Sequence, residues 1–277
     1  MQSAKLFFIT GVSSGFGRAL AEEALSAGHR VVGTLRNESD RAQFEALSPG
    51  QCFGRVLDVT DFAAIPPLVD AVEREIGAVD VLVNNAGYGH EGIMEESPLQ
   101  ELVAQFNVNV FGAVAMIKAF VPWFRARRAG HILNITSMGG FITLPGISYY
   151  CGSKFALQGI SETLTKELKP FNIAVTAVQP GSFRTDWAGR SMVRAARSID
   201  DYDLSFGPIR ETRMQRSGHQ PGDPHRAARA MLALIQHPAP PASLLLGSDA
   251  VTLVKEKLQQ MSAGIDAWEE ISRSTDG

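Results

Sequence analysis

The sequence predicts a three-layer α/β fold in which one doubly wound parallel sheet is covered by helices on both faces. Strand-length apolar runs alternate with helix-length periodic segments along the 277 residues. The strand candidates are almost continuously apolar, as LFFI at 6–9 and VDVLV at 79–83 show, which is typical of strands buried on both faces. Right-handed crossovers between such strands and helices then build a doubly wound sheet.

The chain, residues 1–277, is expected to form a single domain, because it contains no internal repeat and no linker. The expected strands span 5–10, 30–35, 53–58, 79–84, 130–136, 173–179 and 243–246. The expected helices span 16–27, 61–76, 99–127, 153–169 and 224–236, followed by a C-terminal helix at about 251–271.

A long insertion at about 183–223 breaks this alternation and is expected to be a lid over the substrate; the alternative is a poorly ordered surface excursion. Its apolar side chains suit an apolar pocket together with 138–141 and 144–149; they are Trp187, Met192, Phe206 and Met214. Its arginines favour a solvated helix face over a site for a carboxylated substrate; they are Arg184, Arg190, Arg194, Arg197, Arg210, Arg213 and Arg216.

The composition excludes several classes of partner and site. Hydrophobic residues make up 45% and the net charge is -3, so a sizeable core is expected and neither nucleic acid nor a membrane is indicated as a partner. Cys52 and Cys151 lack the spacing of metal ligands, so no metal is expected. The apolar run at 6–9 is too short for a signal peptide, and we expect no membrane span and a cytoplasmic location.

A glycine-rich turn, TGVSSGFG at 10–17, lies between the first strand and the first helix. Glycines allow a tight turn and close approach of a pyrophosphate, while the helix N-terminus offers free N–H donors. The turn therefore predicts a dinucleotide site made by Gly11, Ser13, Ser14, Gly15, Phe16 and Gly17.

The end of the second strand indicates which dinucleotide binds. It carries Arg36 and no acidic residue, so it suits the 2′-phosphate of NADP(H) better than the free ribose hydroxyl of NAD(H). Ser13 is a second candidate donor to that phosphate. The alternative interpretation is that Arg36 is a solvated loop residue.

Tyr150 and Lys154 are four residues apart at the start of a helix, which places both side chains on one face. A neighbouring ammonium is expected to lower the pKa of the phenol, so that Tyr150 can exchange a proton with a substrate hydroxyl. Ser137 ends the fifth strand, where ligands bind in doubly wound sheets. Asn109 is either a core residue satisfied by its own backbone or an anchor for a water beside Lys154. His90 is expected at the surface.

Seven motifs in order make the chain similar to the short-chain dehydrogenase/reductase family, whose Rossmann fold matches the predicted architecture. They are TGVSSGFG at 10–17, LDVTD at 57–61, NNAG at 84–87, NVNVFG at 107–112, NITS at 134–137, YCGSK at 150–154 and PGSFRT at 180–185. The segments at 222–231 and 245–250 resemble the branch with hydroxysteroid and retinol dehydrogenase-like members.

The resemblance implies roles for individual residues. The catalytic tetrad would be Asn109, Ser137, Tyr150 and Lys154, with Lys154 also binding the nicotinamide ribose. The adenine would meet Asp58 and Val59, the cleft would be lined by Asn85, Ala86 and Gly87, and the nicotinamide would be flanked by Pro180, Gly181, Phe183 and Thr185. The resemblance also implies a homodimer or homotetramer built on the helices at 99–127 and 153–169.

The expected function is an NADP(H)-dependent oxidoreductase that interconverts a small-molecule alcohol and a ketone or aldehyde. One alternative is a non-catalytic NADP(H)-binding sensor of the same fold, but such a protein is expected to lose Tyr150 or Lys154. An epimerase or dehydratase is a third alternative, but the chain is short for those enzymes.

Overall fold

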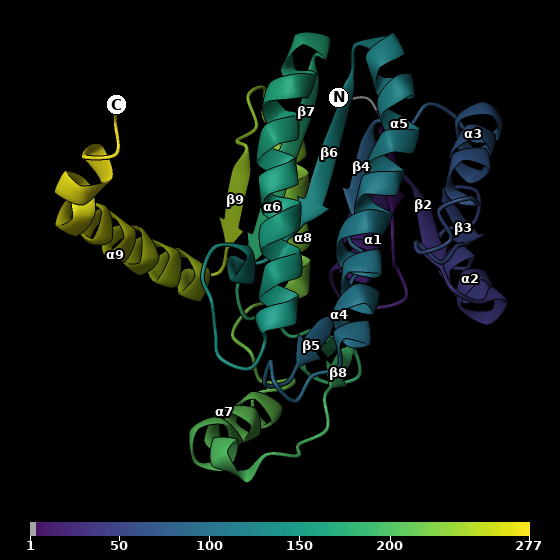
Figure 1. Ribbon diagram of the computed structural model, residues 1–277. Helices are drawn as coiled ribbons and strands as arrows, with labels where there is room; N and C mark the ends of the chain where they lie inside the picture. The colour runs from purple at the N-terminus through teal and green to yellow at the C-terminus, as the bar shows by residue number, and fades with distance from the viewer. Residues whose placement is uncertain (1–3) are drawn as a thin grey trace.

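A seven-stranded parallel sheet forms the centre of this computed structural model, which describes residues 4–277 (Figure 1). The strand order is β3-β2-β1-β4-β6-β7-β9, so the direction of winding reverses between β1 and β4. The strands are β1 Leu6–Ile9, β2 Arg30–Leu35, β3 Cys52–Val56, β4 Val81–Asn84, β6 Gly130–Ile135, β7 Ile173–Pro180 and β9 Ser243–Leu246. The predicted doubly wound, Rossmann-like α/β fold is confirmed.

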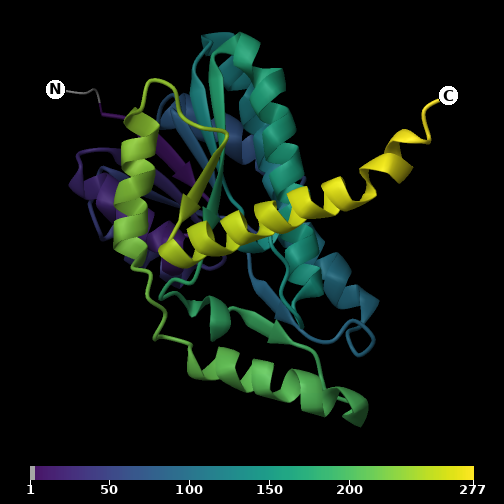
Figure 2. The same ribbon diagram turned by 90° about the vertical axis from the view of Figure 1, so that its left-hand side faces the viewer.

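Alternating side chains of most strands pack in two separate cores. Helices cover both faces of the sheet (Figure 2). In β1, Phe7 and Ile9 pack in one core, and Phe8 packs in the other. The first core is closed by α1 Gly15–Ser26, α2 Glu38–Glu45 and α8 Pro224–Gln236. The second is closed by α3 Ile65–Glu75, α5 Ala113–Arg127 and α6 Ser148–Leu168.

Two α-helices escaped prediction because their sequences lack apolar periodicity. Helix α2 reads ESDRAQFE and buries only Phe44; it begins because the side chain of Asn37 accepts a hydrogen bond from the Asp40 N–H. Within 183–223, α7 Asp203–Gln215 contains Pro208, and a proline inside a segment argues against a helix there. This segment also contains β8 Met192–Arg194, which pairs in parallel with β5 Gly89–Glu91.

The helical run Leu99–Arg127 is long and apolar enough to cross a membrane by length and composition. It consists of α4 Leu99–Phe106, a π-helical turn η1 Asn107–Gly112, and α5. Phe120 and Phe124 of this run are fully buried against the sheet. Core helices pass the same test of length and composition, so the run is weak evidence for a membrane.

The buried imidazole of His131 on β6 makes the stability of the fold sensitive to acid. Burial lowers the pKa of His131 to about 4, and the charge of Lys5 acts in the same direction. Between pH 6.5 and 4 the unfolded chain therefore binds a proton that the native state does not, and the free energy of unfolding falls as the pH falls.

We predict that His131→Asn flattens this acid dependence, reducing the loss between pH 6.5 and 4 by roughly 2–3 kcal/mol. Urea unfolding at a series of pH values measures it. The exposed His237 offers a matched control, His237→Asn, which should keep the native slope. Equal slopes for native protein and His131→Asn would contradict the prediction.

Candidate active site

A single cavity of about 1430 Å³ opens at the carboxyl ends of the central strands and gathers most of the predicted site. Its wall includes Gly11, Ser13, Ser14, Gly15, Phe16, Arg36, Asp58, Val59, Asn85, Ala86, Gly87, Ser137, Tyr150, Lys154, Pro180, Gly181, Phe183 and Thr185. Two predicted residues, Gly17 and Asn109, are buried behind that wall. The position at the reversal of strand order is where doubly wound folds bind ligands.

The glycine turn has a backbone that only glycine accommodates. Gly11 and Gly15 have positive φ angles of 71° and 60°. A Cβ atom on Gly17 would lie 2.3 Å from the carbonyl oxygen of Gly11 and 2.4 Å from Nδ2 of Asn85. Ser14 caps α1 without a side-chain hydrogen bond, so the first turn of the helix presents its amides to the cavity. This geometry fits a pyrophosphate.

Polar strand residues that sequence reasoning missed hold this turn against its neighbours. Oγ1 of Thr34 accepts from the Gly11 N–H at 3.1 Å. Oγ1 of Thr10 accepts from the N–H groups of Asn85 and Ala86, each at 3.0 Å. Hydroxyls inside otherwise apolar strands were the available signal for these contacts. Asp249, another missed residue of the wall, accepts from the Ser182 N–H at 2.7 Å.

The far end of the cavity combines an exposed cation with a fixed carboxylate. Arg36 is exposed at the end of β2. The Asp58 carboxylate accepts from the N–H and hydroxyl of Thr60 at 2.9 and 2.7 Å. These hydrogen bonds lower the pKa of Asp58, and the charge of Arg36 adds to the effect. Arg36 therefore lies where a ligand anion at the cavity mouth would meet it.

Tyr150 and Lys154 project from the first turns of α6 toward Ser137 and the end of β6. Nζ of Lys154 donates to the Ile135 carbonyl at 2.8 Å and lies 5.8 Å from the centre of the Tyr150 ring. Burial raises the pKa of Tyr150 to about 12, opposed in part by its hydrogen bond with Ser137. Burial also lowers the pKa of Lys154 to about 8. Loss of solvation therefore outweighs the lowering of the phenol pKa that was expected from Lys154.

Asn109 lies in the π-helical turn η1 and connects two parts of the site. Its Nδ2 donates to the Tyr88 carbonyl and to Oγ of Ser153, both at 3.1 Å, and its Oδ1 accepts from the Tyr88 N–H at 3.1 Å. The side chain is thus satisfied by the loop after β4 and by α6, not by its own backbone. π-helical turns of this kind are frequent at functional sites.

The rest of the cavity is bounded by the 183–223 segment, called the lid below, and its wall mixes apolar with charged and polar side chains. The apolar ones include Met138, Leu144, Ile147, Trp187, Val193 and Ile209, and the charged and polar ones include Asp186, Arg190, Thr212, Arg213, Arg216, His219 and Gln220. Three residues predicted to face the substrate lie elsewhere: Met192 and Phe206 are buried in the lid, and Met214 is 47% exposed outside the cavity. The ring of Phe206 packs directly on Gly146, so it supports the wall from behind.

A buried carboxylate, Glu91 on β5, holds the lid arginines. Its side chain is 0% exposed, and Arg213 Nη1 donates to it at 2.8 Å. Arg210 and Arg194 lie 3.2 and 3.5 Å from its other oxygen. The prediction of a solvated arginine face is wrong for these three residues. The surface position predicted for His90 is also wrong: it is buried, with Nε2 2.6 Å from Glu101.

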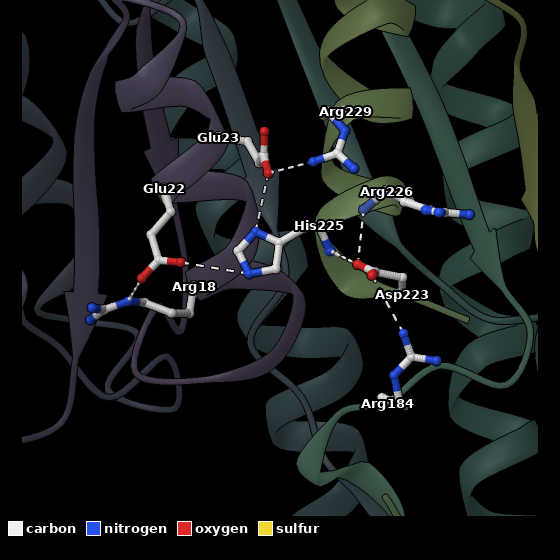
Figure 3. A network of polar contacts seen from close by, with 8 residues as sticks. All are labelled: Arg18, Glu22, Glu23, Arg184, Asp223, His225, Arg226 and Arg229. Atoms are coloured by element: carbon white, nitrogen blue, oxygen red, sulfur yellow. Dashed lines mark hydrogen bonds and ion pairs between the residues drawn. The ribbon is translucent and has the colours of Figure 1, made fainter. Parts of the chain in front are cut away.

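A second polar network anchors the base of the lid to the dinucleotide side (Figure 3). Arg184 lies 3.4 Å from Asp223, whose carboxylate also accepts from the N–H groups of His225 and Arg226 at the start of α8. Glu23 of α1 accepts from Arg229 at 2.8 Å and contacts His225 at 3.1 Å. The lid is therefore attached to both halves of the cavity.

We predict that Glu91→Gln loosens the lid, because removing one partner of a buried ion pair leaves the arginines uncompensated. Trypsin should cleave the lid at least about tenfold faster than in the native protein, as expected for local opening. The matched control is Glu211→Gln, which alters an exposed carboxylate of α7 that accepts a hydrogen bond from Gln215. An unchanged rate of cleavage in Glu91→Gln would contradict the prediction that Glu91 holds the lid in place.

Comparison with known proteins places these features in a family. A family model described as short chain dehydrogenase matches residues 5–194. Oxidoreductase BOA17 of Botryotinia fuckeliana is 35% identical over 97% of this chain and 98% of its own. A 3-ketodihydrosphingosine reductase of Bacteroides thetaiotaomicron is 36% identical over 88% of each chain. The crystal structure of a short-chain dehydrogenase from Streptomyces avermitilis superposes with a TM-score of 0.93, at 39% identity over 100% of both chains.

The matched region runs from β1 to β8 and so contains the glycine turn, Ser137, Tyr150 and Lys154. The chain therefore belongs to the short-chain dehydrogenase/reductase family of oxidoreductases.

Proposed function

We propose that this protein is an NADP(H)-dependent oxidoreductase that interconverts an alcohol and a ketone or aldehyde of apolar character, with Tyr150 as the general acid/base. One observation carries the proposal: Tyr150, Ser137, Lys154 and the glycine turn line the same cavity. The similar Bacteroides protein is by its name a reductase of a ketone. The apolar side chains of the wall, among them Leu144, Ile147 and Trp187, support a substrate of apolar character.

The cofactor preference rests on the end of β2. A guanidinium presents a planar fork of donors that matches a phosphate, and Arg36 places one at the mouth of the cavity. No carboxylate ends β2 to receive the free ribose hydroxyls of NAD(H). When bound, the nicotinamide exchanges hydride with the carbinol carbon of the substrate.

The protein residues handle the proton. With a pKa raised to about 12, Tyr150 keeps its proton at neutral pH and can donate it to a substrate oxygen held by Ser137. Carbonyl reduction requires this proton donor, and alcohol oxidation requires the same group to accept the proton. Lys154, which donates to Ile135 and borders Gly87, is positioned to bind the nicotinamide ribose.

The resemblance to the hydroxysteroid and retinol dehydrogenase-like branch, the cytoplasmic location and the homodimer or homotetramer remain predictions. For the assembly, the exposed side chains of Val103 on α4, Phe111 on η1 and Phe155 on α6 support an interface on these helices.

We predict that Tyr150→Phe lowers the turnover rate by roughly 10²- to 10⁴-fold, because it removes the proton donor. The measurement is loss of NADPH absorbance with a panel of aldehydes and ketones. Tyr149→Phe is the matched control, since the neighbouring hydroxyl bonds to the Ser97 carbonyl and lies outside the cavity wall. Tight NADPH binding without turnover across the panel, in both directions, would instead support a sensor.

We predict that Arg36→Ala weakens NADPH binding about 10- to 100-fold and leaves NADH binding nearly unchanged, because one charge-assisted phosphate contact contributes roughly 1.5–3 kcal/mol. Fluorescence titration with both cofactors measures this. Arg74→Ala, at an exposed position on α3, controls for the loss of a surface charge. An equal loss of affinity for both cofactors would rule out recognition of the 2′-phosphate by Arg36.

A further inference from the structure

The C-terminal helix α9 Ser248–Arg273 leaves the body of the molecule after its first turns (Figure 1). Ala250 and Val254 are its buried residues. Figure 2 shows the remaining turns extending away from the sheet and its helices. Isolated helices are marginally stable in water, and most helical stability comes from packing an apolar face against a neighbour.

The projecting part of α9 carries a regular apolar stripe. The sequence places Val254, Leu258, Met261, Ile265 and Trp268 at alternating intervals of four and three residues, the seam of a coiled coil. Beyond Val254 these side chains are between 47% and 66% exposed. The face that packs on the body at Val254 therefore continues into solvent without a partner in the described chain.

The charges of α9 indicate what pairs with this stripe. Lys255, Glu256 and Lys257 lie near the body and carry a net charge of +1 (two lysines, one glutamate), whereas Asp266, Glu269, Glu270 and Arg273 lie toward the free end and carry a net charge of −2 (three acids, one arginine). A second α9 in antiparallel orientation would place each basic end against an acidic end and oppose the two helix dipoles. Parallel pairing would instead place like charges side by side.

We propose that α9 pairs with α9 of a second copy of this chain as an antiparallel two-stranded coiled coil, with its two-fold axis near Ala263. Heptad positions then stack Leu258 on Trp268 of the partner subunit, and Met261 on Ile265 of the partner subunit, with both layers repeated by symmetry. Lys255 lies on the flank that faces Glu269 of the partner subunit.

The residues at the proposed axis are small, which fits a close crossing. They are Ser262, Ala263 and Gly264, and a Cβ atom on Gly264 would meet no other atom within 4 Å in the single chain. Glycine inside an exposed helix costs roughly 1 kcal/mol relative to alanine. Within a pair it allows the two backbones to approach. This interface is separate from the one expected on α4 to α6.

The first test is the mass of the full-length protein by sedimentation velocity. Leu258→Glu combined with Ile265→Glu should halve the assembly mass, whichever other interface the protein uses. The matched control, Gln260→Glu with Ala267→Glu, adds the same charge at the same seven-residue spacing on the outer face of the helix and should keep the native mass. A native mass retained by the seam variant would overturn the proposal.

The second test reports the relative orientation of the two α9 helices and leaves the apolar stripe unchanged. Cys52 and Cys151 are buried, so an engineered cysteine on α9 dominates oxidative cross-linking. Ser262→Cys should form a disulfide-linked dimer. Lys255→Cys should not, because the two cysteines would be about 24 Å apart along antiparallel helices. Equal cross-linking at both positions, or none at Ser262→Cys, would overturn the antiparallel pair.

A membrane surface is the competing occupant of the stripe. The acidic residues of the free end disfavour an anionic bilayer, since surface-bound amphipathic helices carry basic polar faces. Flotation with mixed phosphatidylcholine and phosphatidylglycerol vesicles decides between the two. The proposed pair would be wrong if the protein floats, if the Leu258→Glu and Ile265→Glu substitutions abolish flotation, and if the mass is the same with and without them. The stripe would then bind a lipid surface.

Discussion

The buried side-chain amide of Asn109 holds together the elements on which the rest of the site depends. It bonds both the N–H and the carbonyl of Tyr88 and also Oγ of Ser153. The loop after β4 and the helix that carries Tyr150 and Lys154 are therefore tied to one point. The π-helical turn at Asn107–Gly112 places this amide there, so the irregular turn is a requirement of the site.

Burial then determines the chemistry of the two ionisable groups. The same loss of solvation raises the pKa of Tyr150 to about 12 and lowers that of Lys154 to about 8. A phenol that holds its proton is suited to donate it when charge develops on a carbonyl oxygen. The lid, held by Glu91, contributes Trp187 to the cavity wall, and the centre of its ring lies 5.0 Å from that of Tyr150.

The sequence predicted best those parts of the site whose residues are close together in the chain. The glycine turn and the Tyr150–Lys154 pair each lie within a few consecutive residues, so spacing alone places them, and the alternating pattern placed the strands. Helix α2 was missed because its eight residues bury a single apolar side chain. The contact between Glu91 and Arg213 was missed because these residues are separated by 122 positions, and only the folded lid brings Arg213 of α7 to β5. The lid arginines were placed wrongly for the same reason. His90 was placed wrongly although its partner Glu101 is only 11 positions away.

The central claim is that this cavity transfers hydride to a carbonyl carbon. The most direct test supplies NADPH deuterated at both C4 positions of the nicotinamide with a carbonyl substrate, and analyses the product by mass spectrometry. The account predicts an alcohol that carries one deuterium at its carbinol carbon. Bound NADPH that keeps its label, with no deuterated alcohol from any carbonyl in a broad panel, would contradict it.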